Sequence, residues 1–179
     1  MRRYLLILCL PFFIWTGCRK DGPGPINALT QNHKATVFTF LAPDCPLSQN
    51  YALTLNTLYM EFKPNNVGFY GVIAGTGFGS KDVNDYINNY RIGFPVLFDE
   101  DWKITDFFKA TTTPEAFAVN SEGTVFYKGA IDNWAPALGQ HREVITRHFL
   151  VDALNSFLEG RNVEVKQTEA VGCFIERKG

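Results

Sequence analysis

Residues 34–48 read Lys-Ala-Thr-Val-Phe-Thr-Phe-Leu-Ala-Pro-Asp-Cys-Pro-Leu-Ser, and this stretch joins a strand pattern to a helix start. β-Branched and aromatic residues are continuous over 36–41, which predicts a buried strand. Pro43 breaks the strand pattern. Pro46 suits the first position of a helix, because its missing N–H is not needed there. The sequence therefore places Cys45 between the end of a buried strand and the first turn of a helix.

Apolar patterns farther along the chain predict an α/β fold. Residues 46–62 place apolar side chains at helical spacing, and 67–74 is a second run that predicts a buried strand. The further elements expected are a helix over 81–90 capped by Ser80, a strand over 94–98, a helix over 101–109, hairpin arms at 115–119 and 124–128, and a helix over 143–158 stopped by Gly160. Two strand–helix units imply parallel central strands, and the hairpin adds antiparallel ones. We therefore expect a central mixed sheet flanked by helices.

Residues 1–18 resemble the signal segment of a bacterial lipoprotein. Arg2 and Arg3 precede an apolar run over 4–15, which is too short for a typical membrane-spanning helix and fits the core of a signal peptide. The run ends in Thr-Gly-Cys18, a pattern in which the cysteine is acylated and becomes the first mature residue. An uncleaved anchor or a plain secretory signal is the alternative. The expected division is a signal over 1–17, a lipid-anchored tether over 18–33, a domain over 34–160 and a tail over 161–179, placed at the cell envelope and facing the periplasm or the exterior.

The net charge and the number of cysteines limit which functions the chain can have. The net charge is −1 and no basic stripe is present, so nucleic-acid binding has no electrostatic support. The chain has four cysteines. Cys9 leaves with the signal and Cys18 carries the lipid, so only Cys45 and Cys173 remain for thiol chemistry. Two cysteines allow one intramolecular disulfide or two free thiols.

The order of elements resembles that of the thioredoxin superfamily. The Cys45 loop follows the first core strand, and Thr113-Pro114 precedes the hairpin. Phe-Pro-Val-Leu-Phe-Asp at 94–99 and Glu-Ala-Phe-Ala-Val-Asn-Ser-Glu-Gly at 115–123 are similar, more closely, to the redoxin branch, the relatives of alkyl hydroperoxide reductase and thiol-specific antioxidant protein. The resemblance covers most of the predicted domain and implies a thioredoxin-like fold with thiol chemistry at Cys45.

The same resemblance gives roles to residues outside the Cys45 loop. Pro114 is similar to the cis-proline that faces the active cysteine of thioredoxins, and its implied role is to present the backbone of Thr113 to an extended substrate. An ordinary trans turn proline is the alternative. The tail phrase Thr-Glu-Ala-Val-Gly-Cys, which ends at Cys173, is similar to one that follows this domain in some redoxins with a single active-site cysteine.

Two departures from the superfamily bear on the reaction. Ser48 stands where thioredoxins have the second cysteine of Cys-x-x-Cys. Ala42 stands where peroxiredoxins have a threonine or serine, so the hydroxyl that would orient a peroxide is missing. The missing hydroxyl disfavours peroxide reduction, and both departures favour a rival interpretation in which the domain has lost its catalysis.

Cys45 has the surroundings of a reactive thiol. The N–H groups and dipole of a helix start favour an anion, which lowers the pKa of a cysteine there. We expect the Ser48 hydroxyl to donate a hydrogen bond to the thiolate, and the Asp44 carboxylate to oppose ionisation. The alternative is an inert cysteine buried under the helix.

The sequence thus predicts a thiol-based oxidoreductase in which Cys45 attacks a disulfide or, less readily, a hydroperoxide, and Cys173 resolves the intermediate. About a dozen residues separate Gly160 from Cys173, and such a tail extends to roughly 40 Å, enough to cross a small domain. Val163, Val165 and Val171 give the tail apolar contacts, and Gly172 permits a close backbone approach.

The expected partners are a protein thiol or disulfide, or a small hydroperoxide, together with the membrane through the lipid anchor. No cofactor is expected. The alternative function is a catalytically silent redoxin-like binding module or a copper carrier, in which Cys45 and Cys173 would bind metal with His141 or His148.

Overall fold

The computed structural model describes residues 24–177. The predicted signal peptide and the acylation of Cys18 lie outside these residues. Within the described part of the chain, each helix is too short or too polar to cross a bilayer.

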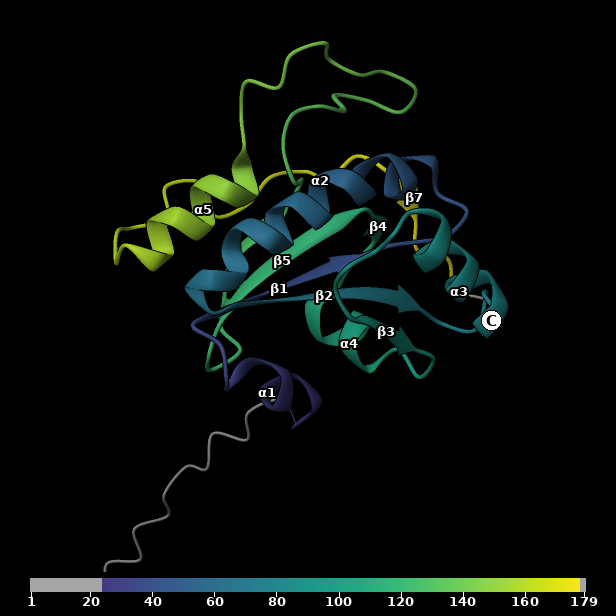
Figure 1. Cartoon of the computed structure of the whole chain (residues 1–179), viewed down its shortest axis with the longest axis horizontal. Helices are drawn as coiled ribbons and strands as arrows, with labels where there is room; N and C mark the ends of the chain where they lie inside the picture. The colour runs from purple at the N-terminus through teal and green to yellow at the C-terminus, as the bar shows by residue number, and fades with distance from the viewer. Residues whose placement is uncertain (1–23, 178–179) are drawn as a thin grey trace, which may run out of the picture.

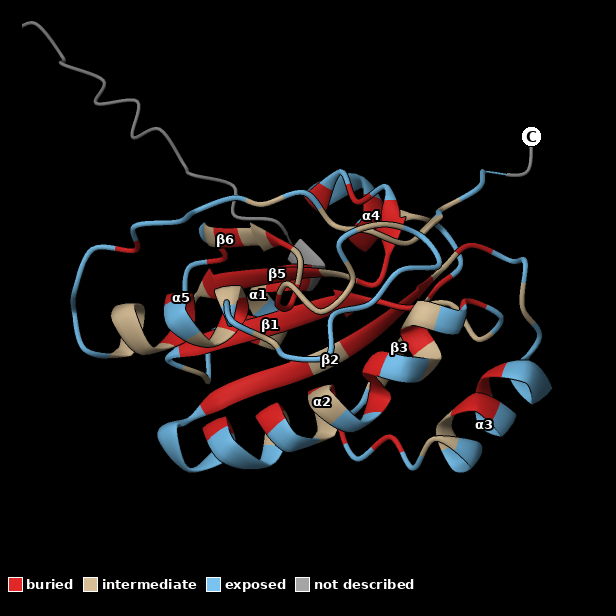
Figure 2. Ribbon diagram, turned by 90° about the horizontal axis from the view of Figure 1, so that it is seen from above, coloured by how far each residue is buried: buried red, intermediate tan, exposed pale blue. Residues whose placement is uncertain are grey.

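A five-stranded mixed sheet forms the centre of the molecule, in the order β3-β2-β1-β5-β6 (Figures 1 and 2). The parallel strands are β1 (Ala35–Phe40), β2 (Val67–Ala74) and β3 (Val96–Asp99). The antiparallel hairpin consists of β5 (Glu115–Asn120) and β6 (Val125–Gly129). This arrangement confirms the predicted mixed sheet. All six residues of β1 are buried, because the strand is paired on both sides and covered on both faces (Figure 2).

Two helices cover one face of the sheet. α2 (Pro46–Phe62) begins and ends where the sequence predicts, with Pro46 at its first position, and contributes Tyr51, Leu55 and Leu58 to the core. α5 (Phe149–Leu158) packs beside it through Leu150 and Leu154. A short 3₁₀ helix at Lys63–Asn65 leads from α2 into β2.

The opposite face is covered by α4 (Lys103–Phe108) and by α1 (Gly24–Thr30), a helix that the sequence interpretation missed. Ile26 of α1 is fully buried against the same cluster as Phe38 and Phe108. Residues 24–30 therefore belong to the folded domain and not to the tether expected over 18–33. The Gly- and Pro-containing composition suggested a linker, whereas one apolar side chain fits a pocket of the core.

Two helix ends differ from the prediction. α5 begins at Phe149 and not at residue 143, because the Asn133 side chain accepts the backbone N–H groups of Thr146 and Arg147, at 3.0 and 3.1 Å, and so holds this segment as a loop. α3 (Ser80–Asn89) is capped by the contact between the Gly79 N–H and the Asp82 carboxylate at 2.9 Å, and Ser80 is its first residue and not its cap.

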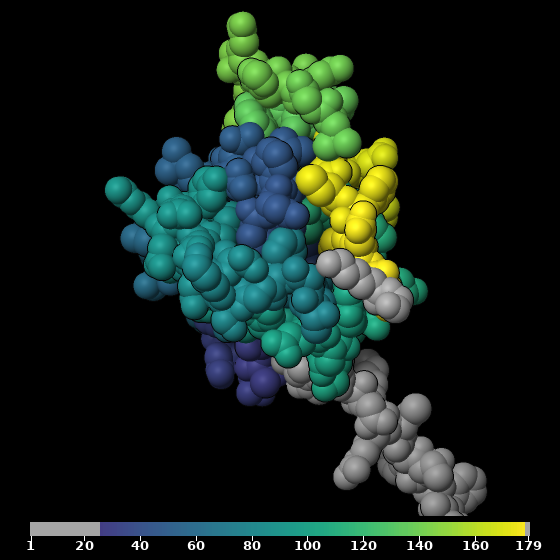
Figure 3. All heavy atoms as spheres, turned by 90° about the vertical axis from the view of Figure 1, so that its right-hand side faces the viewer, coloured from purple at the N-terminus to yellow at the C-terminus, as the bar shows by residue number. Residues whose placement is uncertain are grey.

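The tail after α5 returns across the molecule and forms a strand of its own. Its strand β7 (Cys173–Phe174) pairs antiparallel with β4 (Thr112–Thr113). Before that, the tail runs beside β6, where Lys128 exchanges backbone hydrogen bonds with Lys166 and Thr168, both at 3.0 Å. Figure 3 shows the tail in yellow on the surface, next to the blue segment that contains α2.

Candidate functional site

Cys45 is the residue immediately before α2. Its backbone is extended (φ −82°, ψ 115°), its N–H donates to the Ala42 carbonyl at 3.1 Å, and its carbonyl accepts the first helical N–H, from Gln49, at 3.0 Å. The turn and the helix therefore fix the direction of the side chain. Cys45 has 0% of its surface exposed.

Thr113 lies directly against the sulfur of Cys45. The protonated thiol donates to the Thr113 carbonyl at 3.1 Å. The Thr113–Pro114 peptide bond is cis, as the resemblance implied. The backbone of β4 thus lies against the cysteine at the start of α2.

Cys173 reaches the same place from the tail. Cys173 pairs with Thr113 and Phe174 pairs with Thr112, while the Ile175 N–H donates to the Thr111 carbonyl at 2.9 Å. A Cβ atom at Gly172 would lie 2.0 Å from the Thr113 carbonyl oxygen, so only glycine allows the strands to approach this closely. The close approach expected of Gly172 is confirmed.

The pKa values of the two thiols are shifted in opposite directions. Burial raises the pKa of Cys45, but hydrogen bonds from the Cys173 thiol, from the backbone of Ser48 and Cys173 and from the Thr113 hydroxyl outweigh it and lower the pKa of Cys45 overall. Burial, the hydrogen bond to Cys45 and the negative charge of Cys45 raise the pKa of Cys173 to about 11. Cys45 is therefore the sulfur that ionises first, and Cys173 is its hydrogen-bond donor.

Ser48 and Asp44 do not affect the Cys45 thiolate in the way that the sequence predicts. The buried Ser48 hydroxyl accepts the Ala42 N–H at 3.2 Å, while its backbone N–H provides the hydrogen bond to the Cys45 thiolate. The Tyr86 hydroxyl donates to the Ser48 carbonyl at 3.0 Å, which ties α3 to the start of α2. The exposed Asp44 raises the pKa of Cys173, because its negative charge disfavours a second anion.

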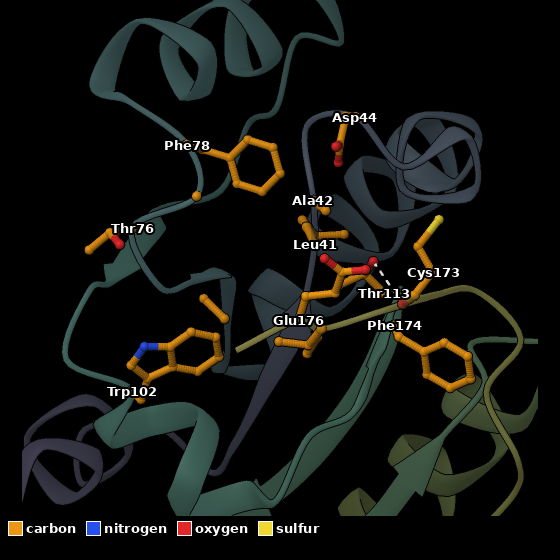
Figure 4. Close-up of a pocket in the computed structure, with 13 residues that line it drawn as sticks. Leu41, Ala42, Asp44, Thr76, Phe78, Trp102, Thr113, Cys173, Phe174 and Glu176 are labelled. Carbon is orange, nitrogen blue, oxygen red and sulfur yellow. Dashed lines mark hydrogen bonds between the residues drawn. The ribbon is translucent and has the colours of Figure 1, made fainter. Parts of the chain in front are cut away.

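A cavity of about 400 Å³ opens beside Cys173 (Figure 4). Cys45 is not part of its wall, whereas Cys173 is. The wall carries three aromatic side chains, Phe78, Trp102 and Phe174, and two acidic side chains, Asp44 and Glu176. The sequence interpretation did not find this cavity, because its walls come from the β2–α3 loop, the start of α4 and the tail, which only the fold brings together.

The tail contacts along β6 were also missed. The Thr168 hydroxyl accepts the Ala130 N–H at 2.9 Å and contacts the Tyr127 hydroxyl at 2.8 Å. A Cβ atom at Gly129 would lie 2.2 Å from the Thr168 carbonyl oxygen. Of the valines expected to hold the tail, Val163 is buried, whereas Val165 is exposed. Polar contacts and glycines therefore seat the tail together with apolar side chains such as Val163 and Ile175.

The copper alternative gains no support from the site. No group of three potential metal-ligating side chains comes together within residues 24–177. His141 stacks on Trp134, with ring centroids 5.7 Å apart, and His148 stands at the start of α5.

The sheet order, the cis-proline and the cysteine before α2 define a thioredoxin-like α/β protein. More particularly, residues 18–128 match the model of the AhpC/TSA family, which is more than half of the chain, and the protein belongs to that family.

Solved structures share the fold. An uncharacterized conserved protein from Geobacillus kaustophilus is 25% identical, with a TM-score of 0.74 over 83% of this chain and 80% of its own. A hypothetical protein from Sinorhizobium meliloti 1021 is 21% identical, with a TM-score of 0.71 over 81% and 80%. A putative thioredoxin from Neisseria meningitidis is 16% identical, with a TM-score of 0.57 over 76% and 81%. The search of curated proteins finds no match.

Proposed function

We propose that this chain is an exported, membrane-anchored thiol–disulfide oxidoreductase in which Cys45 is the nucleophile and Cys173 the resolving thiol. The observation that carries the proposal is that Thr113 joins the two cysteines: its carbonyl accepts the Cys45 thiol at 3.1 Å, and it pairs with Cys173 across β4 and β7. The pKa of Cys45 is lowered and that of Cys173 is raised to about 11. A thiolate is the reactive form of cysteine, so the site prepares one sulfur for attack and keeps the other protonated beside it.

The reaction proceeds by two exchanges. The Cys45 thiolate attacks one sulfur of a substrate disulfide, a mixed disulfide forms, and the other substrate sulfur leaves as a thiolate. Cys173 then loses its proton and attacks the Cys45 sulfur, which releases the second substrate thiolate and leaves a Cys45–Cys173 disulfide. The substrate gains two electrons, which the two cysteines lose.

The raised pKa of Cys173 suits the order of these steps. Two of its causes, the hydrogen bond to Cys45 and the charge of Cys45, exist only while Cys45 is free. Once Cys45 is bound in a mixed disulfide, both are gone and the pKa of Cys173 falls. Cys173 therefore becomes a better nucleophile only after the substrate is attached.

The burial of Cys45 implies that the tail moves during substrate entry. β7 covers the Thr113 backbone through only two residue pairs, so its release breaks few contacts. An extended substrate segment can then take the place of β7 along Thr113. A disulfide is favoured over a peroxide as substrate, because Ala42 offers no hydroxyl to orient a peroxide.

Turnover of a disulfide-bonded peptide by the full chain in detergent tests the assignment. Cys45→Ser abolishes turnover, whereas Cys173→Ser accumulates a mixed disulfide on Cys45 that mass mapping detects. Turnover that survives Cys45→Ser, or that is unchanged in Cys173→Ser, overturns the assignment and favours a silent binding module.

The anchoring part of the proposal rests on the N-terminal sequence alone. Replacing Cys18 with alanine removes the residue that would be acylated, so Cys18→Ala shifts the protein out of the membrane fraction or leaves an unprocessed precursor. Fractionation and intact mass measure both outcomes, and unchanged processing and membrane association rule out acylation.

A further inference from the structure

The two sulfurs of the site differ in their access to the outside. Cys45 is fully buried beneath the tail and is absent from the wall of the cavity, whereas Cys173 is partly exposed and forms part of that wall. A disulfide between them would keep the tail over Cys45, because it ties the two together. A thiol entering the cavity therefore meets the sulfur of Cys173.

We propose that the thiol partner which re-reduces the Cys45–Cys173 disulfide enters this cavity and attacks Cys173. This inference rests on the proposed function, because it requires that disulfide. The incoming thiolate forms a bond to the Cys173 sulfur, the bond between Cys173 and Cys45 breaks, and the electron pair remains on Cys45. A second thiol of the partner then attacks the partner sulfur that is bound to Cys173, and Cys173 leaves as a thiolate. The dithiol partner is thereby oxidised to a disulfide, and both cysteines of this chain are reduced.

The leaving group supports the same direction. In thiol–disulfide exchange the thiol of lower pKa leaves faster. The Ser48 backbone N–H and the Thr113 hydroxyl both lower the pKa of Cys45, so a departing Cys45 thiolate enters a prepared site. Attack on Cys45 would instead expel Cys173, whose pKa is still raised by burial and by the charge of Asp44.

The cavity walls indicate the chemistry of the partner. Asp44 and Glu176 bring two carboxylates, Phe78 and Trp102 bring aromatic rings, and none of the described residues in the wall is a lysine or an arginine. Arg177, which follows Glu176, is paired with Asp106 and lies over the Trp102 ring, 4.9 Å from its centre. A thiol carried on an apolar or basic protein segment fits this cavity, whereas an anionic thiol such as glutathione is repelled.

Mapping the first adduct on the oxidised full chain tests the point of attack. The protein is mixed with 2-mercaptoethanol, quenched with acid after increasing times, alkylated and digested. Extrapolation to the shortest times separates the first site from later migration. We expect mercaptoethanol on Cys173 and the alkylating agent on Cys45; mercaptoethanol appearing first on Cys45 overturns the inference. Absence of a Cys45–Cys173 peptide before thiol addition removes the proposed function and the inference together.

Monothiols of different charge test the partner chemistry. After correction for thiolate fraction and for reactivity with a peptide disulfide, cysteamine should react at least about threefold faster than mercaptoacetate, and added salt should reduce the ratio. Asp44→Asn should lower the ratio, whereas Glu122→Gln, in the exposed turn of the hairpin, should leave it unchanged. Equal rates for the two thiols in the unsubstituted protein overturn the charge assignment.

Discussion

The two cysteines of the candidate site belong to regions that are held in place very differently. Cys45 joins β1, which pairs with six residues on each side, to the 17-residue helix α2. Cys173 belongs to a two-residue strand at the end of a tail held by a few backbone and hydroxyl contacts. The comparison teaches that the proposed nucleophile is fixed by the core, whereas its proposed partner sits on a short strand that few contacts hold to the rest of the domain.

Removing a core side chain of α2 has the largest expected effect on the fixed region. Leu55→Ala leaves a cavity under the helix and should lower the free energy of unfolding by about 2–5 kcal/mol, measured by urea denaturation. Leu53→Ala is the matched control in the same helix, because Leu53 is 76% exposed, and should change stability by less than about 0.5 kcal/mol. Similar losses in both variants would contradict this placement of α2.

A methyl group at Gly172 tests the movable region. Gly172→Ala cannot seat β7, because the added Cβ would overlap the Thr113 carbonyl. Formation of the Cys45–Cys173 disulfide should slow by at least about tenfold, since the effective concentration of the two thiols falls. Quenched alkylation and intact mass follow the rate.

Stability separates this effect from general damage. Gly172→Ala should unfold at nearly the same urea concentration as the unsubstituted protein, and Gly77→Ala, whose Cβ meets no atom within 4 Å, should pair its thiols at the normal rate. A large drop in the stability of Gly172→Ala would mean that the tail is part of the core.

The contacts along β6 should contribute a smaller amount. Thr168→Val removes the hydroxyl that contacts Ala130 and Tyr127, which should cost roughly 1–2 kcal/mol and speed hydrogen exchange at the Ala130 amide. The exposed Thr57→Val on α2 is the control and should change stability little. Unchanged exchange at Ala130 would show that Thr168 does not seat the tail.

The smallest expected effect is on acidity. Cys173→Ala removes a hydrogen-bond donor to the Cys45 thiolate, so the pKa of Cys45 should rise, while Cys173→Ser retains a donor and should change it less. Because the pKa of Cys45 is lowered, its thiolate persists below the usual thiol range and disappears as the pH falls through that pKa. In Cys173→Ala the loss should occur at higher pH, measured by thiolate ultraviolet absorbance. Identical profiles in the two variants would contradict the hydrogen bond.

Sequence patterns predicted the elements that local periodicity determines. The bounds of α2 and β2 agree with the prediction, because continuous apolar runs and Pro46 specify them locally. α1 and β7 were missed, since each is too short to show a period and depends on a distant partner. The start of α5 was wrong, because the side chain of Asn133 competes for the backbone there.

The candidate site was predictable in its parts and not in its arrangement. Counting cysteines singled out Cys45 and Cys173, and the resemblance singled out Thr113 and Pro114. The cross-strand pairing of Thr113 with Cys173, and the use of the Ser48 backbone in place of its hydroxyl, follow from how the tail folds back and leave no local signature.

The tail contact at Lys128 also bears on self-association. β6 is an outer strand of the sheet, and an unpaired outer strand offers its N–H and C=O groups to another chain. The tail forms hydrogen bonds with both backbone groups of Lys128, so these groups are not offered to another chain. The segment that carries the proposed resolving thiol thus also protects this edge from intermolecular strand pairing, and lifting it along its whole length would expose the edge to aggregation.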